Sequence, residues 1–223
     1  MQKFATPAAV TAVLDIAAGH IRLIATDRTD TTVEIRPADA GKSHDVRAAE
    51  DLQVTYADGT LSITAPDPKN RLLGNSGAVE ITVQLPAGSH LDATTAIGGL
   101  RGVGRLGNVT VDAQQATITL DETAGARLTV LDGDITVGRL TGPADLTAKK
   151  GDLHVTEATR GDLTLRTDHG DITVGAASTT SATLDADTAY GRVHNSLNNS
   201  AGADAALAVR ATTACGDITA SSL

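Results

Sequence analysis

The sequence has very few aromatic residues and a single cysteine. Phe4, Tyr56 and Tyr190 are its only aromatic residues, and it contains no tryptophan. Proteins that bind single-stranded nucleic acid stack bases on aromatic side chains, and ordinary sugar sites also use aromatic faces, so the composition argues against both classes. Cys215 stands alone, which excludes an internal disulfide and a cysteine metal cluster. We expect Cys215 to be a small buried or half-buried thiol.

Basic residues and long apolar runs are also scarce. The 223 residues include 27 acidic and 18 basic ones, and the formal net charge is −9. No basic stripe is present to bind phosphates, so we expect no nucleic-acid partner. No apolar run approaches the roughly 18 residues of a membrane span. Asp15 interrupts the mild Ala/Val stretch near the start before it resembles a signal-peptide core. These features predict a cytoplasmic protein with no membrane span.

The sequence is rich in small and branched apolar residues, together with Thr, Asp and Gly. Hydrophobic residues make up 41% and charged residues 20%, a balance typical of a globular protein rather than a disordered one. Ala, Val, Ile and Leu suit a narrow interior filled by short stacked side chains. Thr, Asp and Gly are typical of short strands joined by tight turns. The composition therefore favours an all-β fold.

A five-residue pattern recurs with a period near 18 residues. Gly-Asp-Ile-Thr-Val at 133–137 returns with small changes at 151–155, 170–174, 191–195 and 216–220, and 98–102 and 116–120 fall into the same register. The starts are separated by 18, 17, 18, 19, 21 and 25 residues. A second series of strands begins at Leu91, Val109, Leu128, Leu146, Leu163, Leu184 and Leu207, with spacings of 18, 19, 18, 17, 21 and 23. Two series with one period indicate an internal repeat.

One repeat has room for two short strands and two turns, which is one coil of a parallel β-solenoid. Because alternate side chains of a strand point to opposite faces, we expect Ile135 and Val137 to face the interior and Thr136 to face outward. A single coil cannot bury its apolar face, so coils stack about 4.8 Å apart. The glycine permits a positive φ at the bend, and the aspartate can accept backbone donors there.

The repeat therefore predicts a parallel β-solenoid of about seven coils over residues 89–223, all part of one continuous fold with the rest of the chain. An antiparallel meander is the main alternative. Residues 1–88 predict an antiparallel β cap. Its expected parts are a hairpin over 11–16 and 20–25, a strand over 32–36, a helix over 43–50 with Ser43 as N-cap, a hairpin over 52–56 and 61–65, a polar loop over 66–77, and a strand over 79–85.

Several short segments form a specific combination. They are Phe4–Pro7, Ala48–Glu50 before the Tyr-Ala-Asp-Gly hairpin, Val79–Gly88, the recurrent Gly-Asp-Ile-Thr-Val, and Tyr190–Leu197. Together they resemble the bacterial DUF4097 family of β-strand-repeat proteins, especially its actinobacterial members. The resemblance spans essentially the whole chain and implies a β-solenoid. The adhesin label of that family is largely an inference from its fold, and the resemblance supplies no catalytic residue.

The position three residues after each repeat glycine predicts an outward column of polar side chains. Its members are Arg101, Thr119, Thr136, His154, Thr173, His194 and Thr219. This column is the possible binding face, although a Thr-rich face that only contacts water is the simpler interpretation. Arg and His interrupt the regular Thr lattice that ice binding would need.

Two sets of residues suggest metals but have simpler interpretations. With coils stacked in sequence order, His154 and His194 are expected about 10 Å apart, too far to share one zinc ion. The aspartates Asp134, Asp152, Asp171 and Asp217 lack the Gly-rich nonapeptide of calcium-binding β-rolls, so turn formation explains them better. We therefore predict no metal.

The sequence contains no Gly-x-Ser-x-Gly, His-Glu-x-x-His or phosphate-loop motif. We predict no catalytic residue and no cofactor. The leading hypothesis is a non-enzymatic solenoid scaffold that binds an unidentified protein partner, with no prediction of its oligomeric state. The alternatives are a cell-surface adhesin and a carbohydrate-active solenoid enzyme that would use Arg192 or Asp171.

Overall fold

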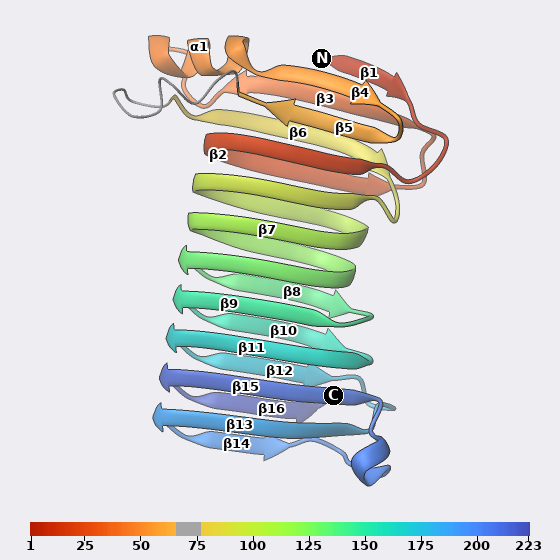
Figure 1. Ribbon diagram of the computed structural model, residues 1–223, viewed down its shortest axis with the longest axis vertical. Coiled ribbons are helices and arrows are strands. Elements are labelled where there is room, and N and C mark those ends of the chain that lie inside the picture. The colour runs from red at the N-terminus through yellow and green to blue at the C-terminus, as the bar shows by residue number, and fades with distance from the viewer. Residues whose placement is uncertain (66–76) are drawn as a thin grey trace. The chain divides into compact units, whose positions relative to one another are not determined.

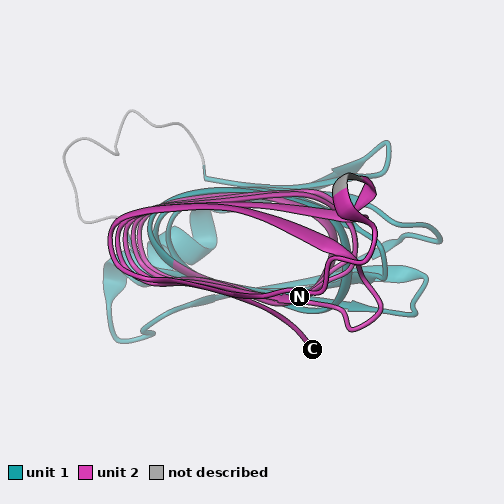
Figure 2. Cartoon of the chain, turned by 90° about the horizontal axis from the view of Figure 1, so that it is seen from below, with its two compact units in different colours: residues 1–116 teal, residues 117–223 magenta. Residues whose placement is uncertain are grey.

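The computed structural model describes residues 1–65 and 77–223, and they form two compact units. Unit 1 comprises residues 1–116 and unit 2 residues 117–223. Figure 2 shows the units in teal and magenta. Both units consist mostly of β-strands, and many neighbouring strands in each unit pair in parallel. This confirms the predicted all-β solenoid class. The predicted boundary between residues 88 and 89 marks where the sequence repeat begins, whereas the two units are defined by compactness. The boundary at residue 89 therefore stays a prediction.

Unit 1 combines parallel coils with antiparallel strands. Its elements are β1 (Gln2–Ala5), β2 (Thr11–Thr26), β3 (Asp30–Pro37), α1 (Ser43–Asp51), β4 (Gln53–Ala57), β5 (Thr60–Thr64), β6 (Val79–Pro86) and the first part of β7 (His90–Asp132). Strand β3 pairs antiparallel with β1 and β6, and β4 pairs antiparallel with β5. In contrast, β5, β6 and β7 all run parallel to β2. The predicted antiparallel strands 32–36 and 52–65 are therefore confirmed.

The predicted hairpin over residues 11–25 is wrong. Both halves of β2 pair parallel with β7, so this segment is a coil of the solenoid. Gly19 has a φ of 145°, close to the 154° of Gly98 opposite it, and both lie at a corner between the two halves. A glycine between two alternating strands is typical of a hairpin and of a coil corner alike. Local sequence could not distinguish them, because the difference lies in which distant strand each half pairs with.

The helix forms as predicted, but its first turn is held by a different residue. Helix α1 spans Ser43–Asp51, its N-cap is Lys42, and no side chain caps it. Asp45 is 3% exposed instead, and its carboxylate accepts hydrogen bonds from the N–H groups of Asp39 (3.1 Å) and Ala78 (2.9 Å). A buried carboxylate bonded in this way ties the first turn of the helix to the segment before it and to the residue before β6. The predicted polar loop lies outside the described residues except for Gly77.

Unit 2 consists of two parallel sheets that face each other across a narrow core (Figure 1). Its elements after β7 are β8 (Ile135–Leu140), β9 (Ala144–Lys150), β10 (Leu153–Ala158), β11 (Gly161–His169), β12 (Ile172–Ala176), β13 (Ala182–Tyr190), β14 (Val193–Ser196), the short 3-10 helix η2 (Gly202–Asp204), β15 (Leu207–Cys215) and β16 (Ile218–Ser222). Viewed from below in Figure 2, the coils of unit 2 superimpose as flattened loops. The alternation predicted at 135–137 is confirmed, since Ile135 and Val137 are both 0% exposed.

The coils of unit 2 are not stacked in sequence order. One sheet runs β7-β8-β10-β12-β16-β14 and the other β7-β9-β11-β15-β13. The coil of β15 and β16 therefore lies between the coil of β11 and β12 and that of β13 and β14. The register also differs from the predicted series at two places. Leu146 lies opposite Leu165 and not Leu163, and Val209, not Leu207, lies opposite Leu163 and Leu184. The repeat spacings of 21 to 25 residues near the end of the chain leave room for the inserted coil of β15 and β16, but they do not show where it lies.

Candidate functional site

The repeat aspartates form a ladder of hydrogen bonds along one corner of unit 2. Each Oδ1 accepts the backbone N–H of the corresponding residue in the adjacent coil: Asp134 from Asp152 (2.9 Å), Asp152 from Asp171 (2.8 Å), Asp171 from Asp217 (2.8 Å) and Asp217 from Arg192 (2.8 Å). This agrees with the predicted turn role, but the donor lies on the neighbouring coil. The ladder fixes the spacing of the coils and occupies carboxylate oxygens that a calcium site would need.

Threonines add a second set of bonds that sequence reasoning missed. The hydroxyl groups of Thr167, Thr213 and Thr188 each donate to a repeat-glycine carbonyl at 3.0 Å, on Gly151, Gly170 and Gly216 respectively. Each threonine precedes the glycine of its own coil by three residues. The pattern Thr-x-x-Gly recurs in these three repeats and also at Thr95–Gly98, so it was a detectable signal in the sequence.

Six of the seven predicted binding-face residues lie in one row on the outer surface of unit 2. In spatial order this Thr/His row is Thr119, Thr136, His154, Thr173, Thr219 and His194, each directly opposite the next. His194 is exposed and the other five are half-buried. Arg101 belongs to unit 1, where it lies opposite Arg22. The row thus presents one hydroxyl or imidazole group per coil and no lysine or arginine.

The two histidines of the row are farther apart than sequence order predicts. Thr173 and Thr219 both lie between them, so their strands are three steps apart, or about 14 Å, rather than the expected 10 Å. His154 Nε2 lies 3.1 Å from the hydroxyl of Thr156. Within residues 1–65 and 77–223, no three His, Cys, Asp or Glu side chains are grouped closely enough to hold a metal ion.

The opposite sheet of unit 2 carries charges of alternating sign. One outward row there runs Arg127, Asp145, Thr164, Arg210 and Asp185. Arg210 Nε lies 3.2 Å from Asp185 Oδ2, so these two members of the row form an ion pair with each other. Exposed pairs of this kind contribute little to stability. The two rows therefore differ in chemistry, one made of hydroxyl and imidazole groups and the other mostly of charged groups.

The residues suggested for a carbohydrate-active enzyme do not come together. Asp171 Oδ1 accepts a ladder bond from Asp217, and Arg192 Nη2 lies 3.3 Å from Asp217 Oδ2. The coil containing Asp217 thus separates Asp171 from Arg192. A convergent acid–base pair at these positions is absent.

A groove of about 780 Å³ in unit 1 was not predicted from the sequence. Asp15, Lys42, Asp112, Thr95 and Ile97 are among the residues that line it. Thr95 is 4% exposed, and its Oγ1 has no hydrogen-bond partner among the described residues. The lining comes from five separate segments, so no local motif marks the groove. Its described lining residues combine charges of both signs and include no serine or cysteine nucleophile beside a base.

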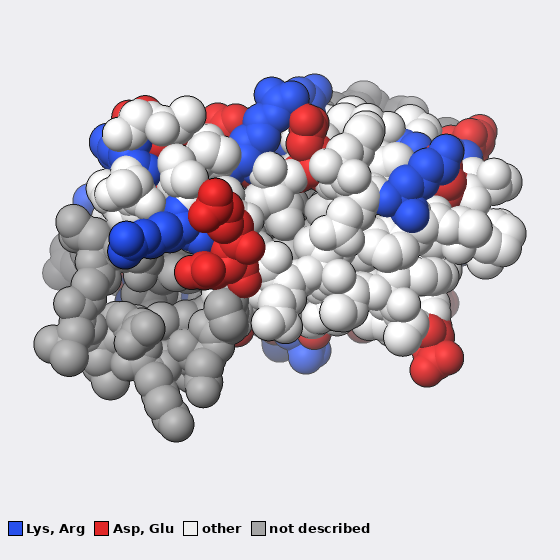
Figure 3. Space-filling model, turned by 90° about the horizontal axis from the view of Figure 1, so that it is seen from above, with Lys and Arg blue, Asp and Glu red and all other residues white. Residues whose placement is uncertain are grey.

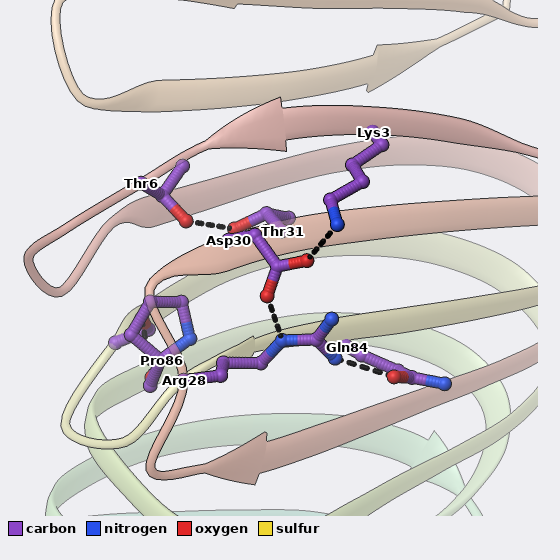
Figure 4. A network of polar contacts seen from close by, with 8 residues as sticks. Lys3, Thr6, Arg28, Asp30, Thr31, Gln84 and Pro86 are labelled. Atoms are coloured by element: carbon purple, nitrogen blue, oxygen red, sulfur yellow. Dashed lines mark hydrogen bonds and ion pairs between the residues drawn. The ribbon is translucent and has the colours of Figure 1, made fainter.

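Charged groups on the end of unit 1 that carries β1 and α1 are mixed in sign. Figure 3 shows basic and acidic side chains lying next to one another there, with uncharged surface between them. The best-defined group is the Asp30 cluster, in which Asp30 accepts from Arg28 Nε and Lys3 Nζ, both at 2.9 Å, and Arg28 also bonds Gln84 (Figure 4). Beside it, the buried hydroxyls of Thr6 and Thr31 are 2.8 Å apart.

The Asp30 cluster predicts a measurable acid dependence of stability. Hydrogen bonds from Arg28 and then Lys3 lower the pKa of Asp30 from 3.8 to about 2. Because the folded pKa lies below the unfolded one, this contribution is complete above pH 4 and is lost as the pH falls toward 2. We expect Asp30→Asn to be less stable than the wild type in urea at pH 7, with the difference shrinking between pH 4 and 2. A difference that stays constant down to pH 2 would contradict this assignment.

None of the helices in residues 1–65 and 77–223 is long and apolar enough to cross a membrane. The sequence model of one family, described as Toastrack DUF4097, matches residues 13–222. The chain belongs to the DUF4097 (Toastrack) family. The resemblance inferred from the short segments is thereby confirmed, and Toastrack is not a known enzyme family. No curated protein matches the chain.

Solved structures of similar fold cover almost the whole Toastrack chain at low identity. A "putative adhesin" from Bacteroides fragilis is 14% identical with a TM-score of 0.60, covering 98% of this chain and 95% of its own. A "putative adhesin" from Parabacteroides distasonis is 13% identical with a TM-score of 0.45. A "putative lipid binding protein" from the same species is 12% identical with a TM-score of 0.46. Each of these two matches covers 98% of this chain and 95% of the other. At such identities the first shows the fold alone, and the scores of the other two carry no argument.

Proposed function

We propose that this Toastrack protein is a non-enzymatic interaction module that holds a protein partner on the Thr/His row of unit 2. The observation that carries the proposal is the register of the row, with one side chain per coil over six adjacent strands. Hydroxyl and neutral imidazole groups both donate and accept hydrogen bonds. The Asp ladder fixes their spacing, so the row is pre-organised and loses little entropy on binding.

The chemistry of the row favours a protein over other ligands. It contains no lysine or arginine, so it lacks the fixed positive charge that nucleic-acid phosphates require. It is flat rather than concave, whereas small-molecule sites are concave and largely apolar. A flat, polar, rigid strand face suits another protein surface of similar extent.

Site-specific crosslinking in cells tests the row directly. A photo-crosslinking residue at Thr173 should give a discrete adduct with a partner protein. The same residue at Thr164 is the matched control, because both are half-buried threonines of one coil on opposite sheets. We expect the Thr173 adduct to be lost on His154→Asp and the Thr164 position to give none. Equal adducts at both positions would refute a dedicated face.

The location of the protein is a separate part of the proposal. The cytoplasmic location expected from the sequence stays a prediction. A surface adhesin is the second candidate, and the description of the Bacteroides structure favours it. Protease treatment of cells that produce the tagged full-length protein distinguishes the two. Digestion only after lysis supports an internal scaffold, whereas digestion on intact cells supports the adhesin.

A further inference from the structure

Strands β13 and β14 form an unpaired edge of unit 2. Among the described residues, β13 pairs only with β15 and β14 only with β16. The N–H of Ala182 at the start of β13 donates to the carbonyl of Asn198 (2.9 Å). Beyond that residue, no strand among the described residues lies beside the outer edge of β13 or β14. Native proteins protect such edges, because a free edge recruits a further strand.

The core of unit 2 is also open at this edge. Val193 is 46% exposed, whereas Ile218 opposite it is 1% exposed. Leu184 is only half-buried, although Val209 opposite it is 2% exposed. Tyr190, at the corner between the two strands, is 78% exposed. The inward positions of Val193 and Leu184, which the other coils bury, thus meet solvent here. Tyr190 differs, because the residues at its position in the neighbouring coils, Cys215 and His169, are not buried either.

The Asp ladder ends at the same edge. Every earlier coil of the ladder offers a carboxylate to the next, but this coil has Arg192 at that position. A further parallel coil of the same kind would find a guanidinium group in place of an acceptor. The edge is therefore suited to an antiparallel strand rather than to continued parallel stacking.

We propose that this edge pairs with the same edge of a second copy, giving a closed two-fold dimer. Since β13 and β14 run in opposite directions, a two-fold axis along the strands places β13 beside β14 of the second copy, antiparallel, and β14 beside its β13. The opposite choice, β13 against β13, would bring the carboxylates of Asp185 and Asp187 beside their own copies, which is unfavourable. In the chosen pairing these face strand β14, whose outward side chains are His194 and Ser196.

The dimer closes both open cores at once. Val193, Tyr190 and Leu184 of each copy leave water together, and the free backbone groups of four strands are paired. Because each edge is used up by its symmetry mate, assembly stops at two copies and gives no filament. The Thr/His row faces outward on the sheets and is not consumed, so the dimer does not depend on the proposed partner.

Sedimentation equilibrium of the full chain over a wide concentration range tests the proposal. We expect a monomer–dimer equilibrium and a dissociation constant raised more than tenfold by Val193→Asp, because the dimer would bury that charge. Leu131→Asp is the matched control, since Leu131 is also an apolar side chain of unit 2 that is 46% exposed, and it should leave the constant unchanged. Circular dichroism should show both variants folded; if Val193→Asp is not, Tyr190→Ser replaces it.

Hydrogen exchange locates the contact. Amides of β13 and β14 should gain protection as the concentration rises, and those of β9 should not. The proposal fails if the chain stays monomeric, if Val193→Asp leaves dimerisation intact, or if assembly continues beyond two copies. It also fails if a different protein, and not a second copy, is what protects β13 and β14.

Discussion

Replacement of Ile135 by Asp should unfold unit 2. Ile135 is 0% exposed and lies between Ile118 and Leu153, so the column of inward side chains offers a carboxylate no partner. An unpaired buried charge costs about 3–5 kcal/mol, and the lost apolar contact adds about 2 kcal/mol. Together they approach the whole stability of an ordinary domain, which is about 5–15 kcal/mol. Hydrogen exchange should show lost protection throughout residues 117–223.

Thr136→Asp is the control for this substitution. Thr136 is the next residue on the same strand, is half-buried, and faces outward in the Thr/His row. The same carboxylate there remains in water, so we expect a change in unfolding free energy within about 1 kcal/mol. Cooperative thermal melting of Ile135→Asp near the wild-type temperature would show that the inward and outward assignment is wrong.

Replacement of Gly170 by Ala should strongly destabilise the corner of unit 2. Gly170 has a φ of 153°, and an added Cβ would lie 2.1 Å from the carbonyl oxygen of Gly151 in the adjacent coil. That oxygen belongs to backbone, which cannot move without disturbing the ladder bond from Asp171 to Asp152. We expect a loss of about 3–5 kcal/mol, from strain and broken corner bonds together. Chemical denaturation measures it.

Gly202→Ala separates backbone strain from the steric clash. Gly202 has a φ of 61°, and nothing lies within 4 Å of an added Cβ there. Only the left-handed backbone cost of about 1–2 kcal/mol should appear. Equal losses for the two variants would mean that the close approach of the coils at Gly170 contributes nothing.

The sequence by itself determined the repeating part of this protein. The period near 18 residues, the alternation at 135–137 and the glycine-aspartate pairs specify parallel coils, because each is a local requirement of one coil. The outward row could also be read from position alone, and five of its neighbouring pairs are in register. The Thr-x-x-Gly corner pattern was equally readable but was overlooked.

Only the tertiary structure decided which strand pairs with which. Residues 11–26 look like a hairpin, but they form a coil, because β7 and not the other half of β2 supplies the partner. The coil of β15 and β16 is inserted between two earlier coils, because similar coils can stack in any order that buries their faces. That order leaves Arg192 at the end of the ladder and Val193 exposed. Strand order is a non-local property, and no single repeat contains it.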